Sequence, residues 1–165
     1  MKQHYEHSSY RERLLEHLFI SELLKLSWQR GDYSLEISKP EVDRSGYDFV
    51  AEANRYIRHI QLKTTFIGSR SSHQKVQPSL GSKPSGCVII IQFDKDTLRL
   101  GPFLYFGAAP GERLPLLDSY KVAKHTKANA QGIKSLRPNL REVPNSAFQK
   151  VGTIEELYQR LFGIS

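Results

Sequence analysis

The chain has 165 residues, of which 39% are hydrophobic and 25% charged, and this composition predicts one globular domain spanning residues 1–165. It has no run of eighteen apolar residues, no apolar leader after Met1 and only one cysteine, Cys87, so we expect a cytoplasmic protein without a membrane partner or an internal disulfide. An excess of 24 Lys and Arg over 17 Asp and Glu gives a formal net charge of +7, which favours polyanionic partners.

The N-terminal half predicts a helix followed by three strands. Residues 9–30 form an amphipathic pattern in which Leu15, Phe19, Leu23 and Leu26 recur at helical spacing, and Gly31 is a common helix end. Alternating and β-branched residues then indicate strands, and a turn-prone segment at 52–55 predicts a hairpin between the second and the third. The three expected strands are residues 33–38, 46–51 and 56–66.

The C-terminal half predicts fewer elements. Residues 68–86 are polar and contain a candidate short helix near Pro78, whereas residues 87–93 are a continuous apolar run typical of a strand buried on both faces. Residues 97–106 can return as another strand, and residues 107–145 have no clear pattern. Thr153 with Glu156 forms a capping box for a final helix to Phe162. The order indicates an α/β domain.

The third strand carries the residues that suggest chemistry. Because side chains alternate along a strand, His59, Gln61, Lys63 and Thr65 share one face. Gln61 and Lys63 are polar in a segment otherwise fit for burial, which requires an explanation. If the second and third strands form a hairpin, Asp48 comes beside both. A carboxylate, an amide oxygen and an amine at one point predict a cation site with a neighbouring proton-handling group.

Asp48, followed thirteen residues later by Gln61-Leu62-Lys63, resembles the motif of the PD-(D/E)XK nuclease superfamily, in which Gln61 takes the acidic position. Methyl-directed restriction enzymes of the superfamily also use Gln there, and residues 22–31 are similar to the first helix of archaeal-type Holliday-junction resolvases. The resemblance covers residues 9–93. It implies a restriction-endonuclease-like core, with a mixed central sheet flanked by helices in the order helix–strand–strand–strand–(helix)–strand.

The resemblance also implies an activity, namely that of a Mg²⁺- or Mn²⁺-dependent endonuclease hydrolysing DNA phosphodiester bonds. Asp48, the Gln61 amide oxygen and the Leu62 backbone carbonyl are then the expected metal ligands. Lys63 is expected to orient the attacking water or to stabilise charge in the transition state. The first helix must supply a further carboxylate, for which Glu22 is the first choice and Glu16 the second.

Two segments without acidic residues, 53–93 and 119–141, indicate where a polyanion would bind. The expected nucleic-acid contacts are Arg58, Thr64, Thr65, Lys75, Lys124, Lys127 and Arg137.

Several alternatives stay open at this stage. Asp48 and Lys63 can form a structural ion pair, Glu22 can bond to an arginine, and the basic segments can be a solvated surface. At the level of function, the alternatives are a catalytically inactive nucleic-acid-binding module of the same fold and a protein–protein adaptor. The oligomeric state is left open, a homodimer included.

Overall fold

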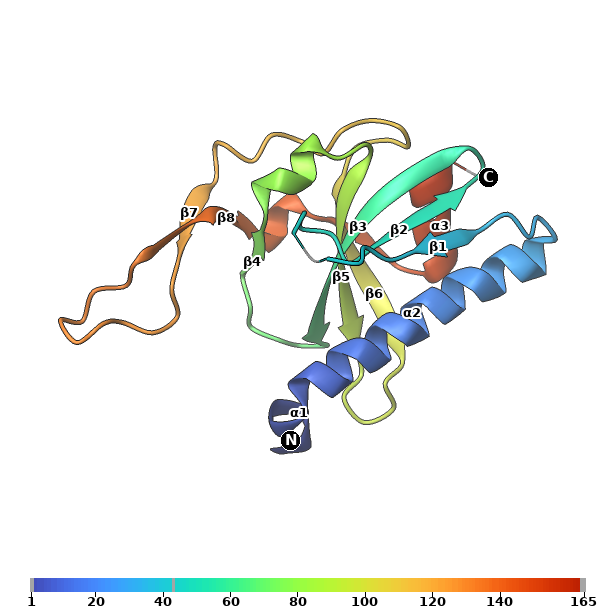
Figure 1. Cartoon of the computed structure of the whole chain (residues 1–165). Coiled ribbons are helices and arrows are strands. Elements are labelled where there is room, and N and C mark those ends of the chain that lie inside the picture. Colours follow the sequence, from blue (N-terminus) through green and yellow to red (C-terminus); the bar gives the residue numbers. More distant parts are fainter. Residues whose placement is uncertain (1, 43, 164–165) are drawn as a thin grey trace.

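The computed structural model describes residues 2–42 and 44–163, which form a mixed α/β fold built on two sheets (Figure 1). In the larger sheet every pairing is antiparallel except the one between its third and fourth strands, so the sheet is mixed, as expected. Its six strands, in spatial order, are β1 (Glu36–Ser38), β2 (Phe49–Ala53), β3 (Tyr56–Phe66), β5 (Gly86–Phe93), β6 (Leu100–Gly107) and β9 (Gln149–Val151).

The smaller sheet is antiparallel and has three strands, which are, in spatial order, β4 (His73–Val76), β8 (Leu136–Pro144) and β7 (Lys121–Lys124). The described helices are α1 (Lys2–Glu6), α2 (Ser8–Arg30) and α3 (Ile154–Phe162), with short 3₁₀ helices η1 (Pro78–Ser82) and η2 (Asn145–Ala147). No helix in this part of the chain is long and apolar enough to cross a membrane.

The two faces of the larger sheet are covered by different elements. On one face, Phe19 and Leu23 of α2 pack with Leu157 and Leu161 of α3 in a single core cluster. On the other face, the smaller sheet, η1 and the loop before β7 form a second cluster around Val88 and Ile90 of β5. The helices therefore cover one face of the larger sheet, and the smaller sheet covers the second face.

The predicted elements with strong apolar patterns are confirmed. The first helix is α2, which ends at Gly31 in the left-handed region; the long third strand is β3; and the apolar run is β5, buried on both faces. The short helix near Pro78 is η1, and the final helix is α3, whose first turn is capped by Thr153 through a hydrogen bond from the Glu156 amide at 3.2 Å.

The predicted strands before β3 begin too early, and backbone conformation explains the difference. Tyr33 has a φ of 47°, so β1 starts only at Glu36, and Gly46 has a φ of 76°, which keeps the chain in a turn until β2 begins. The hairpin between β2 and β3 closes through Asn54 and Arg55 alone. Both have positive φ values, as the favoured two-residue hairpin turns require.

Cys87 lies at the start of β5 in the helix-covered core. Burial raises the pKa of its thiol to about 12, against a smaller opposing effect of the Arg58 charge. This confirms the interpretation of Cys87 as a structural residue rather than a nucleophile, because the thiolate is the reactive form.

Candidate functional site

The candidate site lies where β3 extends beyond its neighbour β2. The pairing between these strands begins at Phe49 opposite Ile60, whereas β3 continues to Phe66 while pairing with β5 along this whole length. The second half of β3, residues 61–66, therefore has a strand on one side only among the described residues. An edge of this kind presents backbone amides and carbonyls that need other partners.

Asp48, the residue just before β2, provides such partners. Its backbone amide donates to the Ile60 carbonyl at 2.8 Å, and its Oδ2 accepts a hydrogen bond from the Leu62 amide at 2.6 Å. In a strand, the amide and the carbonyl of one residue point to the same edge. The Leu62 carbonyl therefore faces the side on which the Asp48 carboxylate lies, which is the arrangement expected if both bind one cation.

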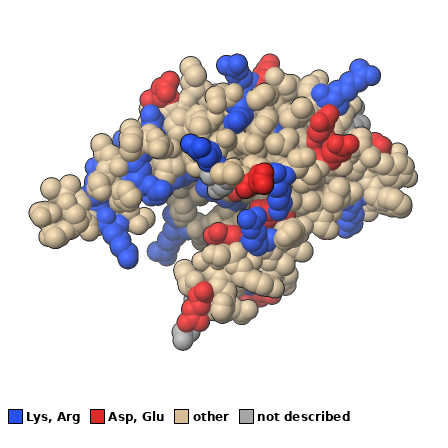
Figure 2. All heavy atoms as spheres, viewed as in Figure 1, with Lys and Arg blue, Asp and Glu red and all other residues tan. Residues whose placement is uncertain are grey.

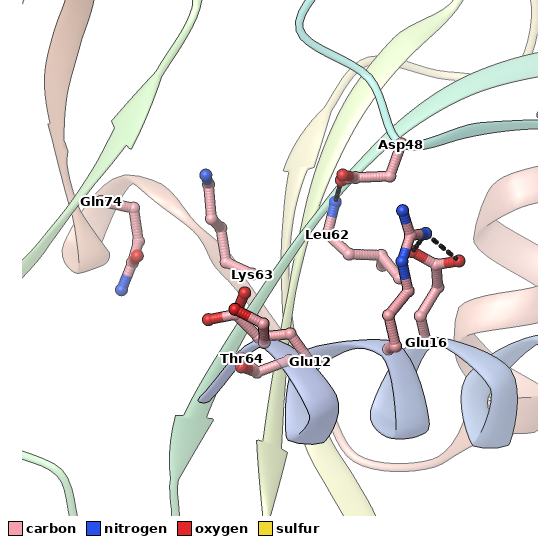
Figure 3. Close-up of a pocket in the computed structure, with 9 residues that line it drawn as sticks. Glu12, Glu16, Asp48, Leu62, Lys63, Thr64 and Gln74 are labelled. Atoms are coloured by element: carbon pink, nitrogen blue, oxygen red, sulfur yellow. Dashed lines mark hydrogen bonds and ion pairs between the residues drawn. The ribbon is translucent and has the colours of Figure 1, made fainter. Parts of the chain in front are cut away.

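A pocket of about 470 Å³ opens beside this edge, between β3, the N-terminal half of α2 and β4 (Figure 3). Carboxylates rise into it from α2, while Asp48 and Lys63 reach it from the β2–β3 region. Its lining consists of Ser9, Glu12, Arg13, Glu16, Asp48, Leu62, Lys63, Thr64 and Gln74.

The structure brings Asp48 and Lys63 into this pocket but not Gln61. The Gln61 side chain is only 6% exposed and does not line the pocket, although it shares a face of β3 with Lys63. Its Oε1 is buried without a hydrogen-bond donor among the described residues. A buried acceptor without a donor is costly, so the surroundings of this atom are incomplete.

The helix carboxylate in the pocket is Glu16, the second choice, rather than Glu22. Glu16 is 8% exposed and accepts hydrogen bonds from Lys39, which follows β1, and from Arg13 at 3.3 Å. Glu22 is half exposed, pairs with Lys25 at 3.6 Å and lines a different pocket near β6 and the start of α3. The two acids lie on opposite flanks of the apolar stripe of α2, and only the flank of Glu16 faces Asp48.

Sequence reasoning missed Glu12, which also lines the pocket. It lies one turn before Glu16 on α2, a spacing that places two side chains on the same helix surface. Its side chain is 63% exposed and approaches Arg11 at 3.8 Å. The spacing of Glu12 to Glu16 was the signal that would have found it, once Glu16 rather than Glu22 is taken as the site acid.

One predicted nucleic-acid contact is wrong. Arg58 is 0% exposed, because its guanidinium packs beneath the end of α3. Its Nε donates to the Leu161 carbonyl at 2.7 Å, and its Nη2 donates to the carbonyls of Arg160 and Ala108 at 3.1 and 3.2 Å. The bonds to Leu161 and Arg160 satisfy carbonyls that the end of α3 leaves without helix partners. Arg58 is thus a structural residue and cannot reach a phosphate.

The other predicted contacts are distributed around the site. Thr64 lines the pocket, whereas Thr65 is partly buried and does not. Lys75 of β4, the residue after Gln74, donates to the Lys124 carbonyl at 3.1 Å. This bond links β4 to the acid-free segment 119–141. The remaining predicted contacts are all exposed; they are Lys124, Lys127 and Arg137.

Within the described residues, no three side chains of His, Cys, Asp or Glu are close enough to hold a metal ion by themselves. The predicted donor set is of a different kind, with two carboxylates and two neutral oxygens. No family model matches the sequence, and no curated protein matches it with significant similarity. The functional argument therefore rests on this geometry.

Proposed function

We propose that the protein is a Mg²⁺- or Mn²⁺-dependent nuclease that hydrolyses DNA phosphodiester bonds, with a restriction-endonuclease-like core. The observation that carries this proposal is the pocket shared by Glu16, Asp48 and Lys63, which come from three separate segments of the chain. Two carboxylates and an amine that converge at the unpaired edge of a strand match the residue types that metal-assisted phosphodiester hydrolysis needs. The order helix–strand–strand–strand, with a later strand parallel to the third, supports the proposed restriction-endonuclease-like core.

The residues fit a hard divalent cation. Mg²⁺ prefers carboxylate and carbonyl oxygens, and it usually keeps several water ligands. Asp48, Glu16 and the Leu62 carbonyl would hold the ion. Gln61 is enclosed beside the pocket, and its Oε1, which has no donor among the described residues, would add a neutral oxygen if the side chain turned into the pocket. When bound, the ion would lower the pKa of a coordinated water and offset charge on the phosphate.

The remaining side chains have roles that follow from their positions. Lys63 brings a positive charge to the pocket wall opposite α2, where it would stabilise charge that develops on the phosphate. The Leu62 amide holds the Asp48 carboxylate in place at 2.6 Å. Arg13 and Lys39 form ion pairs with Glu16 while no cation is bound, so a bound cation would replace them as partners of Glu16.

A second candidate function is an inactive DNA-binding module of the same fold. The observation that favours it is the state of the motif: Gln61 is neutral and buried, and Glu16 is already paired with two cationic side chains. Such a module would keep the basic surface and bind DNA without cleaving it.

The deciding experiment incubates the protein with linear, branched and methylated DNA in the presence of Mg²⁺ or Mn²⁺. Nuclease activity should require the metal and should be abolished in Asp48→Asn. Asp96→Asn, a matched change on an exposed turn, should cleave as the unmodified protein does. Equal cleavage by both variants would refute the assigned site. Salt-dependent DNA binding without any cleavage would instead establish the inactive module, and the absence of binding would leave the adaptor.

A further inference from the structure

A β-hairpin projects from the body of the protein on the side of the smaller sheet (Figure 1). We name residues 121–141 the arm; they comprise β7, the connecting tip and the first part of β8. The tip is closed by backbone hydrogen bonds from His125 to Ser135 and from Asn129 to Ile133, each 2.9 Å long. The Asn129 side chain accepts further bonds from the amides of Gln131 and Ile133 at 3.1 and 2.8 Å. The arm is therefore a two-stranded ribbon, β7 with the first part of β8, that ends in a hydrogen-bonded tip of residues 125–135.

The outer part of the arm has no hydrophobic core of its own. Every side chain from Lys124 to Asn139 is exposed, so the outer part of the arm buries almost no apolar surface. A segment that is ordered but unburied offers its surface to a partner. Its chemistry is basic, because no acidic residue occurs between Asp118 and Glu142. The cations of the arm are Lys121, Lys124, Lys127, Lys134, Arg137 and Arg141.

The arm is connected to the candidate site through β4. Gln74 lines the pocket, and the next residue, Lys75, donates to the carbonyl of Lys124 at the point where the arm leaves the body. Figure 2 shows Lys and Arg side chains gathered over β7 and β8, beside a hollow between the arm and the body. Basic side chains thus lie at the pocket wall, in Lys63, and outward along the arm, with Lys75 of β4 between them.

The composition of the arm selects among nucleic acids. There is no Phe, Tyr or Trp between Tyr120 and Phe148, whereas proteins that bind single strands or RNA loops stack bases on aromatic rings. A two-stranded ribbon fits the major groove of B-DNA, and lysines along it neutralise phosphates. The partner that this surface fits is therefore duplex DNA.

We propose that the arm is a clamp for duplex DNA that holds the helix on one flank of the pocket. This inference rests on the proposed function, because it takes DNA to be the molecule in the pocket. The strand part of the arm, Lys121–Lys124, spans ~10 Å at ~3.3 Å per residue, which is the length of ~3 base pairs at ~3.4 Å each. The arm thus adds contact to one side of the site.

The test shortens the arm without disturbing its base. Lys124 and Leu136 are paired across β7 and β8, so residues 125–135 can be replaced by Asn-Gly, which closes a two-residue hairpin between paired positions. A second variant, Lys127→Gln with Lys134→Gln, keeps the length of the arm and removes the same two lysine charges. Lys95→Gln with Lys150→Gln, two exposed lysines outside the arm, is the matched charge control.

Binding is measured in EDTA by fluorescence anisotropy, with duplexes of 8–30 base pairs and single strands of equal length. If two phosphate contacts are lost, the dependence of log K on log salt flattens by about 1.8, so the intact protein should lose about tenfold more affinity than either arm variant between 50 and 200 mM salt. The shortened arm should also lose the gain in affinity that longer duplexes give, whereas single-strand binding and the Lys95/Lys150 control should not change.

The proposal is overturned if the shortened arm binds duplexes with unchanged affinity and salt dependence. It is also overturned if shortening the arm weakens duplex and single-strand binding equally. It is overturned as well if the shortened arm changes only the sedimentation of the protein in analytical ultracentrifugation, since the arm would then contact another protein chain. Because no metal is present, these results are independent of catalysis: an arm effect without any nuclease activity refutes only the proposed function, and cleavage without an arm effect refutes only the clamp.

Discussion

Replacing Glu16 with Gln removes a buried carboxylate from the pocket and preserves its volume. Its side chain is 10% exposed, but its partners Arg13 and Lys39 are 69% and 38% exposed, so solvent screens both ion pairs. In EDTA we therefore expect the free energy of unfolding to fall by about 1 kcal/mol, which lowers Tm by about 2–4 °C in a chain of this length. Glu22→Gln, which breaks a pair between half-exposed side chains, should cost only about 0.3 kcal/mol.

The two variants should differ more when the metal is added. An ion that binds only the native state, at ten times its dissociation constant, raises the free energy of unfolding by about 1.4 kcal/mol, or Tm by about 3–6 °C. Thermal unfolding followed by circular dichroism, with and without Mg²⁺, measures this rise. We expect it in the unmodified protein and in Glu22→Gln, and we expect it to be lost in Glu16→Gln together with cleavage.

An equal rise of Tm in Glu16→Gln and in the unmodified protein would refute the reasoning, since Glu16 would then contribute nothing to the cation. Loss of the rise in Glu22→Gln would refute it as well, because that side chain lines another pocket. Since each variant is compared with itself in EDTA, a general loss of stability cannot imitate either result.

Four further predictions concern individual residues and the arm. Gln61→Glu should raise Mg²⁺ affinity in a calorimetric titration, because it adds an anionic oxygen at nearly the same volume; an unchanged affinity would show that Gln61 is no ligand. Cys87 should not react with a thiol reagent in the native protein at pH 8, since burial raises its pKa to about 12, and rapid native labelling would contradict that burial. Arg58→Met should lower the free energy of unfolding by about 3 kcal/mol, because carbonyls at the end of α3 lose a charged donor, yet leave the salt dependence of DNA binding unchanged. Replacing Lys124, Lys127 and Arg137 with Gln should leave the free energy of unfolding unchanged and flatten the salt dependence of DNA binding. An unchanged salt slope would mark them as a solvated surface.

The parts of the fold that could be predicted from the sequence are those in which burial leaves a periodic signal. β3 and β5 were predicted nearly to the residue because β3 is rich in aromatic and β-branched residues and β5 is apolar on both faces. β7 and β8 were missed because each has a single buried residue, Ala123 and Val143, so neither alternation nor an apolar run marks these strands. The smaller sheet was missed with them, since β8 is the strand that joins its other two members.

The candidate site was predictable as a strand motif but not as a three-dimensional pocket. Asp48 and Lys63 could be predicted to lie near each other, because a hairpin fixes which residues of two neighbouring strands come together. The choice between Glu16 and Glu22 could not be made in this way, because an amphipathic pattern gives the buried stripe of a helix but not which flank faces which edge of the sheet. Nor does alternation tell whether a polar residue such as Gln61 lines a pocket or is enclosed beside it.

Arg58 also ties the middle of the chain to its far end, because its partners Arg160 and Leu161 lie 102 and 103 residues further along. During synthesis the β2–β3 hairpin leaves the ribosome long before α3 exists to cover its guanidinium and complete the helix-covered core. Contacts of such long sequence separation slow folding, so we expect the domain to acquire its native core only after α3 has emerged. A chain shortened before α3 should then accumulate as a partly folded species that depends on chaperones, rather than as a smaller native domain.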